Sequence, residues 1–282
     1  MKNKQKMFLL EPFVSQKIWG REEWIVSTME KSESFFYDQK KPVSINTLVG
    51  SSYPLLIKTI NANETLSVQV HPDDEYALAY ENSNGKTECW YILDANRDST
   101  IISGLKGNLT KNELLLAIKE NKIEKHLAEK SVKKGDFIFI PAGTVHAIKG
   151  GIRLLEIQQA SDITYRMYDW GRNRELHIEK SLDVAKNFVS EPISNFSGFF
   201  ECEYFSIEKS SVNGAAAIIP LEKNCWATYF IIEGSGTFSS ENEQLKIMEN
   251  STVFVSPNTQ ISAVGNFSFF KISPKPTDTY SL

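Results

Sequence analysis

Two segments of the sequence carry side chains of the kinds that bind metal ions. In LSVQVHPDDEYA, Gln69 and His71 stand two residues apart within a run of β-forming residues. Because side chains alternate between the two faces of a strand, both point to the same side. His146 follows GDFIFIPAGTV, where Pro141 and Gly143 predict a turn between two strands that aims the histidine. The pattern predicts a group of nitrogen and oxygen donors assembled from separate strands.

Glu88, in the segment GKTECWYIL, supplies a carboxylate. We expect it at the start of the next strand, brought back by hairpin pairing across a loop that contains Asn84 and Gly85. Antiparallel neighbours lie about 5 Å apart, which is within ligand-forming reach. Beside Cys89 and Trp90 a carboxylate is costly to bury unless it is paired or metal-bound. Two imidazoles, a carboxylate and an amide suit zinc with a position left open, and they also accept cobalt, manganese or iron.

The histidines and cysteines also have plain structural interpretations. A lone histidine between valines, such as His71, is more often a core residue with one hydrogen bond than a ligand, but the presence of Glu88 favours the metal site. Of the four histidines, His126 and His177 lie in predicted helices, and we expect both on helix surfaces without a catalytic role. The three cysteines stand at unrelated spacings, so they predict neither a disulfide framework nor a thiolate zinc site.

The elements that must hold these side chains are mainly β-strands. Short runs rich in branched and aromatic residues recur between turn signals along the chain, from PLLIKTI to FSFFKI. Two stretches break this pattern, at residues 111–130 and 176–188, where apolar residues recur at intervals of three and four and predict helices. The sequence therefore predicts a mainly β fold with a small helical insertion.

A polar segment with proline and glycine, SEPISNFSG, follows the second predicted helix. We place a domain boundary near residues 189–197, which divides the chain into residues 1–190 and residues 197–282. The first part carries the candidate metal ligands. The second part is again β-rich and contains no histidine, so we expect a scaffold or dimerisation role for it and no histidine-based metal site.

Length and composition narrow the classes of function. The 282 residues suffice for two compact domains, and a hydrophobic content of 41% is typical of a globular protein and not of a disordered one. A net charge of −4 and an isoelectric point near 5.7 provide no basic surface for nucleic acid. The first residues hold too few apolar side chains for a secretory signal, and no later stretch approaches the roughly 18 that a membrane helix needs. We expect a cytoplasmic protein.

Four segments, in this order, resemble type I mannose-6-phosphate isomerases of the short bacterial form, a branch of the cupin superfamily: LSVQVHPDDEYA, GKTECWYIL, GDFIFIPAGTVHAIKGG and LLEIQQASDITYRMYDWGR. The resemblance covers residues 8–188. It implies two cupin-like (jelly-roll) β-sandwich domains and one zinc ion per chain, held by His71, Glu88, His146 and Gln69. The segment KIWGREEW departs from the family, which usually has a second glycine where Arg21 stands, and an arginine there implies a different local turn.

The resemblance further implies that mannose 6-phosphate and fructose 6-phosphate are interconverted through a cis-enediol, with zinc as Lewis acid. Arg166, in TYRMYD, matches the family's catalytic arginine, and its fixed charge could stabilise the enediolate. Glu156 and Lys86 resemble active-site residues, and either could serve as the base. Lys58 is the candidate for binding the substrate phosphate, because neither a glycine-rich phosphate loop nor a second basic cluster is visible elsewhere in the first domain.

Two functions of other kinds fit parts of the pattern. A cupin that binds a sugar phosphate or a metal as a sensor would need the ligands but not Lys86, Glu156 and Arg166 together. An iron-dependent cupin dioxygenase would more naturally present three histidines, or two histidines and one carboxylate, to oxygen. We expect a small-molecule substrate and a monomer or homodimer. The identity of the base, the physiological direction and the exact sugar phosphate stay open.

Overall fold

The structure, a computed structural model, describes residues 5–50, 53–196, 198–214, 217–219, 224–241 and 243–275. It is mainly β, with 49% of residues in strands and 12% in helices, which confirms the fold class expected from the sequence. The chain divides into two compact units, each assembled from separate stretches. One, which we call the sandwich unit, contains Val14–Glu23 and Leu56–Phe196. The other, the terminal unit, contains Met1–Phe13, Trp24–Leu55 and Ser197–Leu282.

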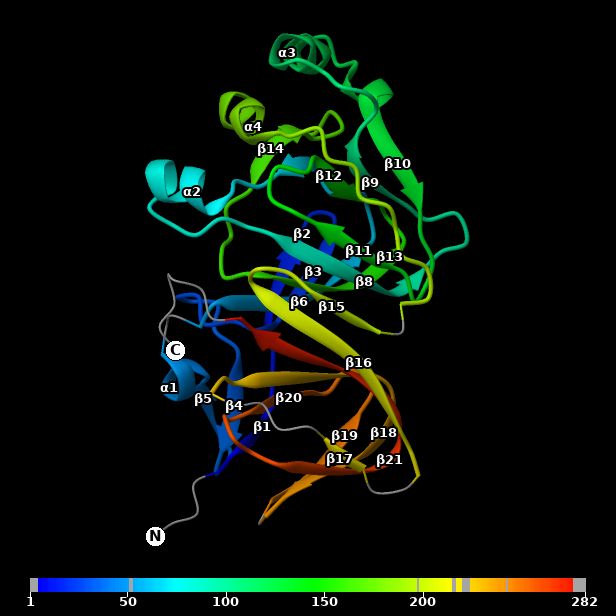
Figure 1. Cartoon of the computed structure of the whole chain (residues 1–282). Helices are drawn as coiled ribbons and strands as arrows, with labels where there is room; N and C mark the ends of the chain where they lie inside the picture. The colour runs from blue at the N-terminus through cyan, green and yellow to red at the C-terminus, as the bar shows by residue number, and fades with distance from the viewer. Residues whose placement is uncertain are drawn as a thin grey trace. The chain divides into compact units, whose positions relative to one another are not determined.

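The sandwich unit is built around two antiparallel sheets that face each other (Figure 1). The strand order of the five-stranded sheet is β10-β9-β12-β7-β14, and that of the six-stranded sheet is β11-β8-β13-β6-β3-β2. The strands of the five-stranded sheet are β7 (Val68–Val70), β9 (Thr100–Leu105), β10 (Leu127–Ser131), β12 (His146–Ile148) and β14 (Tyr165–Tyr168). Those of the six-stranded sheet are β2 (Phe13–Lys17), β3 (Gly20–Val26), β6 (Leu55–Ala62), β8 (Glu88–Ala95), β11 (Phe137–Ile140) and β13 (Ile152–Gln159).

Two hydrophobic cores follow from the alternation of side chains along these strands. One lies between the sheets and includes Ile60, Trp90 and Leu154 of the six-stranded sheet with Ile148 of the five-stranded sheet. The other lies on the outer face of the five-stranded sheet, where residues such as Val70 pack beneath the helices. The covering elements in that core are α3 (Lys111–Lys119), the short 3₁₀ helix η1 (Ile123–His126) and α4 (Ile178–Val184).

The helices differ in part from the sequence prediction. α4 lies within the predicted stretch 176–188, but α3 covers less than half of the predicted stretch 111–130. Asn121 adopts a left-handed conformation with φ of 54°, which ends the helical turn, and residues from Leu127 form β10. A further helix, α2 (Asp74–Glu81), follows β7 and was not predicted; Asp73 caps its N-terminus.

The terminal unit contains an eight-stranded sheet with the main order β1-β20-β18-β21-β16-β15, in which β17 pairs with β21 and β19 with β18. Its strands are β1 (Met7–Leu10), β15 (Phe199–Glu201), β16 (Phe205–Asn213), β17 (Ala217–Ile219), β18 (Ala227–Ser240), β19 (Glu243–Met248), β20 (Thr252–Val255) and β21 (Ile261–Pro274). A hairpin of β4 (Phe35–Asp38) and β5 (Lys41–Ser44) precedes α1 (Asn46–Val49). Aromatic residues such as Tyr229 and Phe238 form its core.

The predicted boundary near residues 189–197 lies where the chain leaves the sandwich unit for the last stretch of the terminal unit. The N-terminal strand β1 belongs with that last stretch, because Met7 pairs with Val255 of β20. The division into folding domains at 1–190 and 197–282 stays a prediction. Among the residues that the structure describes, no helix is long and apolar enough to cross a membrane.

Candidate metal centre and active site

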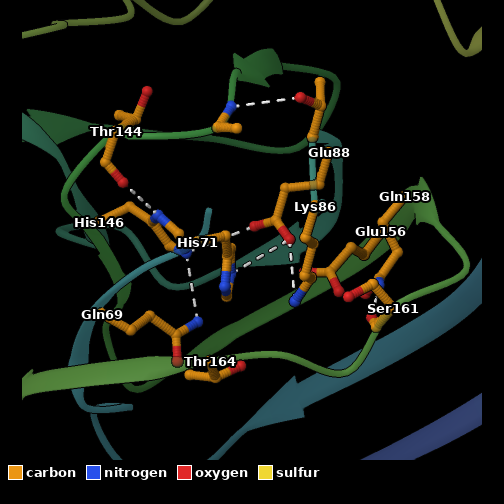
Figure 2. A network of polar contacts seen from close by, with 12 residues as sticks. Gln69, His71, Lys86, Glu88, Thr144, His146, Glu156, Gln158, Ser161 and Thr164 are labelled. Atoms are coloured by element: carbon orange, nitrogen blue, oxygen red, sulfur yellow. Dashed lines mark hydrogen bonds and ion pairs between the residues drawn. The ribbon is translucent and has the colours of Figure 1, made fainter. Parts of the chain in front are cut away.

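The inner faces of the two sheets bring together polar side chains from distant parts of the sequence. On β7, Val68 and Val70 pack in the outer core, so Gln69 between them points to the inner face. The same alternation turns His146 of β12 inward, since its neighbour Ala147 lies in the outer core, and it turns Arg166 of β14 inward. Figure 2 shows Gln69 and His146 beside His71, which follows β7.

The six-stranded sheet contributes Lys58, Glu88 and Glu156 from β6, β8 and β13. They share the inner face with the core residues that alternate with them, such as Trp90 two positions after Glu88. The expected hairpin between the first two ligand strands is therefore wrong. β8 pairs with β11 and β13, and Glu88 reaches the histidines across the sandwich and not along one sheet.

His71, Glu88 and His146 form a compact group of metal-ligand residues, whose ligand atoms all lie within 4.8 Å of one another. Nε2 of His71 is 3.6 Å from Oε2 of Glu88, and Nε2 of His146 is 3.4 Å from Oε1 (Figure 2). Two ligands bound at about 2.1 Å to one tetrahedral ion would stand about 3.4 Å apart. The spacing thus fits a zinc ion between the three side chains.

Both histidines are oriented by backbone carbonyl groups. Nδ1 of His71 lies 2.8 Å from the carbonyl oxygen of Ile163, and Nδ1 of His146 lies 2.8 Å from that of Thr144. A proton on each Nδ1 donates to these carbonyls and leaves the Nε2 lone pair for a metal. Burial lowers the pKa of His71 well below its usual value and that of His146 to about 4. Both imidazoles are therefore neutral, as metal ligands must be.

Buried polar atoms without hydrogen bonds also fit the binding of a cation at this group. Among the described residues, Nε2 of His71 and Oε1 of Glu88 have no hydrogen-bond partner, although both side chains are fully buried. Burial and the nearby charge of Glu156 raise the pKa of Glu88 to about 7. A divalent ion would satisfy these atoms and hold Glu88 as a carboxylate. The residues present therefore fit the expected metal.

Gln69 lies at the edge of this group, with its Nε2 3.2 Å from Nε2 of His146. It is less buried than the two histidines. A half-turn of the amide would present Oε1 instead, which is the atom that could bind a metal. Its role as an additional ligand stays a prediction.

Two buried lysines pair with the two carboxylates of the inner face. Nζ of Lys86 is 3.1 Å from Oε2 of Glu88, and Nζ of Lys58 is 2.9 Å from Oε1 of Glu156. Trp90 donates from Nε1 to the other oxygen of Glu156 at 2.9 Å. Burial alone would raise the pKa of Glu156, but the positive charges of Lys58 and Lys86 lower it overall. Glu156 is thus held as a carboxylate.

Sequence reasoning missed a carboxylate next to Lys58. Oε1 of Glu22, on β3, lies 3.9 Å from Nζ of Lys58, so this lysine stands between two acidic groups. Burial alone would lower the pKa of Lys58, but Glu156 and Glu22 raise it above its usual value. One signal could have pointed to Glu22. It belongs to the segment KIWGREEW, which was compared with the family, and it lies on the same strand as Gly20.

Arg166 is positioned next to the metal group by strand pairing, because its partner in the neighbouring strand is Gln69. Its Nη1 donates to the carbonyl oxygen of Glu175 at 2.7 Å. His177 accepts a hydrogen bond from the Arg166 amide, so this histidine contacts an active-site candidate despite the expectation that it has no role. His126 ends η1 and is partly exposed, as expected for a helix-surface residue.

Several of these side chains line one cavity of the sandwich unit, but His71, Glu88 and His146 are not part of its lining. The polar and aromatic residues of its walls are Lys17, Trp19, Glu22, Lys58, Ser67, Gln69, Lys86, Glu156, Thr164, Arg166 and Arg174. Arg21 is not among them, since its guanidinium points to Glu23 at 2.8 Å. Gly20 has a φ of 147°, and a Cβ there would meet the carbonyl oxygen of Asn61 at 2.0 Å. The position that needs glycine is therefore Gly20, and Arg21 is not a lining residue of the cavity.

The fold and the site define a cupin-type β-sandwich protein with a buried group of metal-ligand residues beside a polar cavity. No family model matches the chain. Among curated proteins, mannose-6-phosphate isomerase ManA of Bacillus subtilis is 41% identical over an alignment of 210 positions, which covers 68% of this chain and 66% of ManA. YvyI of the same organism, named provisionally as a mannose-6-phosphate isomerase, is 33% identical over an alignment of 287 positions, which covers 85% of this chain and 89% of YvyI. The chain belongs to the mannose-6-phosphate isomerase family.

Solved structures show the same fold. The crystal structure of mannose 6-phosphate isomerase from Bacillus subtilis matches 95% of this chain and 99% of that chain, with a TM-score of 0.85 and 28% identity. A mannose 6-phosphate isomerase bound with zinc and yttrium matches 96% of this chain and 100% of that chain, with a TM-score of 0.74 and 15% identity. The alignments with three curated relatives cover 66%, 64% and 44% of those proteins, which is less than two thirds of each.

Proposed function

We propose that the chain is a zinc-dependent isomerase that interconverts mannose 6-phosphate and fructose 6-phosphate. One observation carries the proposal. The buried group of His71, Glu88 and His146 adjoins the cavity lined by Lys58, Glu156 and Arg166, because Lys86 and Gln69 of that cavity contact Glu88 and His146. A metal-binding protein without turnover has no need of a buried carboxylate and an arginine around such a group. The names of the relatives agree with this reaction.

The metal would be held by His71, Glu88 and His146, with Gln69 as a further ligand. When bound, zinc supplies a Lewis acid for the negative charge that develops on the sugar oxygens. The ligand set of two histidines and one glutamate is typical of catalytic zinc with an open position.

Isomerisation requires a base that removes the proton from C2 and returns it to C1 through a cis-enediol, while a hydroxyl proton moves between the oxygens. Glu156 suits this task, because Lys58 and Trp90 hold it as a carboxylate in the cavity. Lys86 is the alternative base, but it already lies 3.1 Å from Glu88. The contacts favour Glu156.

Arg166 would stabilise the enediolate by its fixed charge. It borders the metal group through Gln69, and its Nε has no hydrogen-bond partner among the described residues. Lys58 remains the sequence-based candidate for the substrate phosphate. Its contacts with Glu156 and Glu22 give it a further role, which is to fix the position and charge of the base.

We also propose that the protein acts on a small molecule in the cytoplasm, as a monomer or homodimer. The net charge of −4 favours no polyanionic partner.

The reaction is tested by adding mannose 6-phosphate to the zinc-loaded protein in D₂O and following the products by NMR. The proposal predicts that fructose 6-phosphate forms. It also predicts deuterium at C1 in those molecules in which the base exchanges the proton taken from C2 with D₂O before it delivers a proton to C1. Failure to form fructose 6-phosphate would leave a sugar-phosphate sensor as the better interpretation.

A further inference from the structure

A buried carboxylate holds two arginines at the wall of the cavity. Asp169 follows β14 and is 2% exposed. Its Oδ2 accepts from Nε of Arg174 at 2.8 Å, and its Oδ1 accepts from Nη2 of Arg174 at 2.5 Å and from Nη2 of Arg172 at 2.7 Å. Trp170 and Gly171 both have positive φ, which folds the loop back so that both arginines reach the same aspartate. Arg174 lines the cavity, whereas Asp169 and Arg172 are not among its lining residues.

The charges of this group do not cancel. Two guanidinium groups share one carboxylate, and Arg166 adds a third positive charge nearby. Burial lowers the pKa of Arg166, and the charges of Arg174 and Arg172 lower it further, against the opposing effect of Asp169. The three arginines are therefore close enough to repel one another, and an anion placed between Arg166 and Arg174 would relieve that repulsion.

Three lysines of the cavity are matched by three carboxylates, whereas Arg166, Arg172 and Arg174 have, in the part of the chain that the structure describes, only the carboxylates of Asp169 and Glu175 near Arg166. Lys58 lies between Glu156 and Glu22, and Lys86 pairs with Glu88. Lys17 is 3.7 Å from Glu22. Within the described residues, the excess of positive charge around the cavity is on the side of Arg166 and Arg174.

The positions of Arg166 and Arg174 suit the phosphate-bearing end of the substrate. Arg166 pairs in register with Gln69, which contacts the metal ligand His146. Arg174 lines the same cavity, and its side chain is 28% exposed, compared with 1% for His71. The reacting carbons C1 and C2 belong at the buried metal group. A phosphate on C6, which is strongly hydrated when free, belongs at the more exposed end.

We propose that Arg174 binds the phosphate group of the sugar phosphate, with Asp169 as the residue that positions it and Arg172 as a supporting charge. This proposal rests on the proposed function. A guanidinium offers two parallel donors that match phosphate oxygens, and a carboxylate behind it fixes its plane. Phosphate binding therefore depends on Arg174 more than on Lys58, whose charge Glu156 and Glu22 already balance.

The test is calorimetric binding of fructose 6-phosphate and of fructose to the zinc-loaded full chain. The variants are Arg174→Ala, Arg174→Lys and Asp169→Asn, with Arg153→Ala as a matched control, because Arg153 lines a different cavity of the same unit. Loss of Arg174 should weaken fructose 6-phosphate binding about 10- to 100-fold and leave fructose binding unchanged. Lysine should restore part of the affinity, and Asp169→Asn should give an intermediate loss.

The outcomes separate the two proposals. If the wild-type protein binds no fructose 6-phosphate, the proposed function fails. If it binds and isomerises the sugar phosphate but Arg174→Ala binds it equally well, the function stands and the phosphate assignment is wrong. A loss that affects fructose as strongly as fructose 6-phosphate would also contradict the assignment, since it would show a general disturbance of the site. Unaltered circular dichroism and zinc content establish that each variant is folded.

Discussion

His177 and Arg166 are joined by two hydrogen bonds at the start of α4. The amide of Arg166 donates to Nδ1 of the histidine ring at 3.1 Å, and the amide of His177 donates to the carbonyl oxygen of Arg166 at 2.8 Å. β14 is an edge strand and pairs with β7 on one side only. His177 provides the hydrogen-bond partners for Arg166 on the other, unpaired side of β14. His177 is thus a positioning residue for Arg166.

Replacing His177 with alanine removes the acceptor for the Arg166 amide. We expect turnover to fall about 3- to 10-fold with zinc content unchanged, because the strand that carries Arg166 loses one of its fixed contacts. Asparagine, whose side-chain oxygen can accept the same hydrogen bond, should recover most of the loss. Equal turnover in His177→Ala and the wild type, measured at saturating substrate, would remove this role.

Arg166→Ala should lower turnover much more, by roughly 100- to 1,000-fold, because the charge that stabilises the enediolate is lost. Zinc content should not change, since Arg166 is not a ligand. Arg166→Lys keeps a positive charge but not the planar pair of donors, so it should recover only part of the activity. Turnover of the alanine variant at the wild-type rate would exclude Arg166 from the mechanism.

His71→Ala and His146→Ala should lose both bound zinc and activity, because each removes one of three ligands. His126→Ala is the matched control, since His126 lies on the partly exposed η1 and should keep both. Metal content by atomic absorption after gel filtration measures the difference. Stoichiometric zinc in both ligand variants would show that the ion, if present, is bound elsewhere.

Asp169 should make stability depend on pH. Burial alone would raise its pKa, but Arg174 and Arg172 lower it below its usual value of 3.8. Because the folded-state pKa is the lower one, the stabilisation is present above pH 3.8 and is lost as the pH falls through the folded-state pKa. Urea unfolding should therefore show a difference in the free energy of unfolding between wild type and Asp169→Asn at neutral pH, and this difference should narrow as the pH falls below 3.8. A constant difference would mean that the carboxylate charge is not involved.

Part of the grouping of the candidate ligands could be predicted from the sequence, because the alternation of side chains along a strand is a local property. That alternation placed Gln69 and His71 together, and the turn at Pro141 and Gly143 aims His146 as expected. The partner of Glu88 could not be found in this way. Glu88 lies on β8, and local sequence does not decide whether β8 joins the sheet of β7 or the opposite sheet. In the structure β8 is in the opposite sheet, and the unpredicted helix α2 is part of the connection between them.

Other features depend on contacts that are distant in the sequence. The pairing of Met7 with Val255 joins strands from opposite ends of the chain, so it leaves no trace in local composition. The contact of Lys58 with Glu22 and the sharing of Asp169 by two arginines likewise required the fold. The helix predicted for residues 111–130 was too long, because α3 ends before Asn121, which has a left-handed conformation. The apolar pattern continues regularly to residue 130 and gives no sign of this end.

The central claim is that one chain carries a metal-dependent isomerase built on His71, Glu88 and His146. The most direct measurement is a coupled assay for fructose 6-phosphate formed from mannose 6-phosphate, run on the purified protein, after chelation, and after zinc is restored. We expect activity that disappears on chelation and returns with about one zinc per chain. Activity that survives complete removal of metal, or no activity in protein with stoichiometric zinc, would contradict the claim.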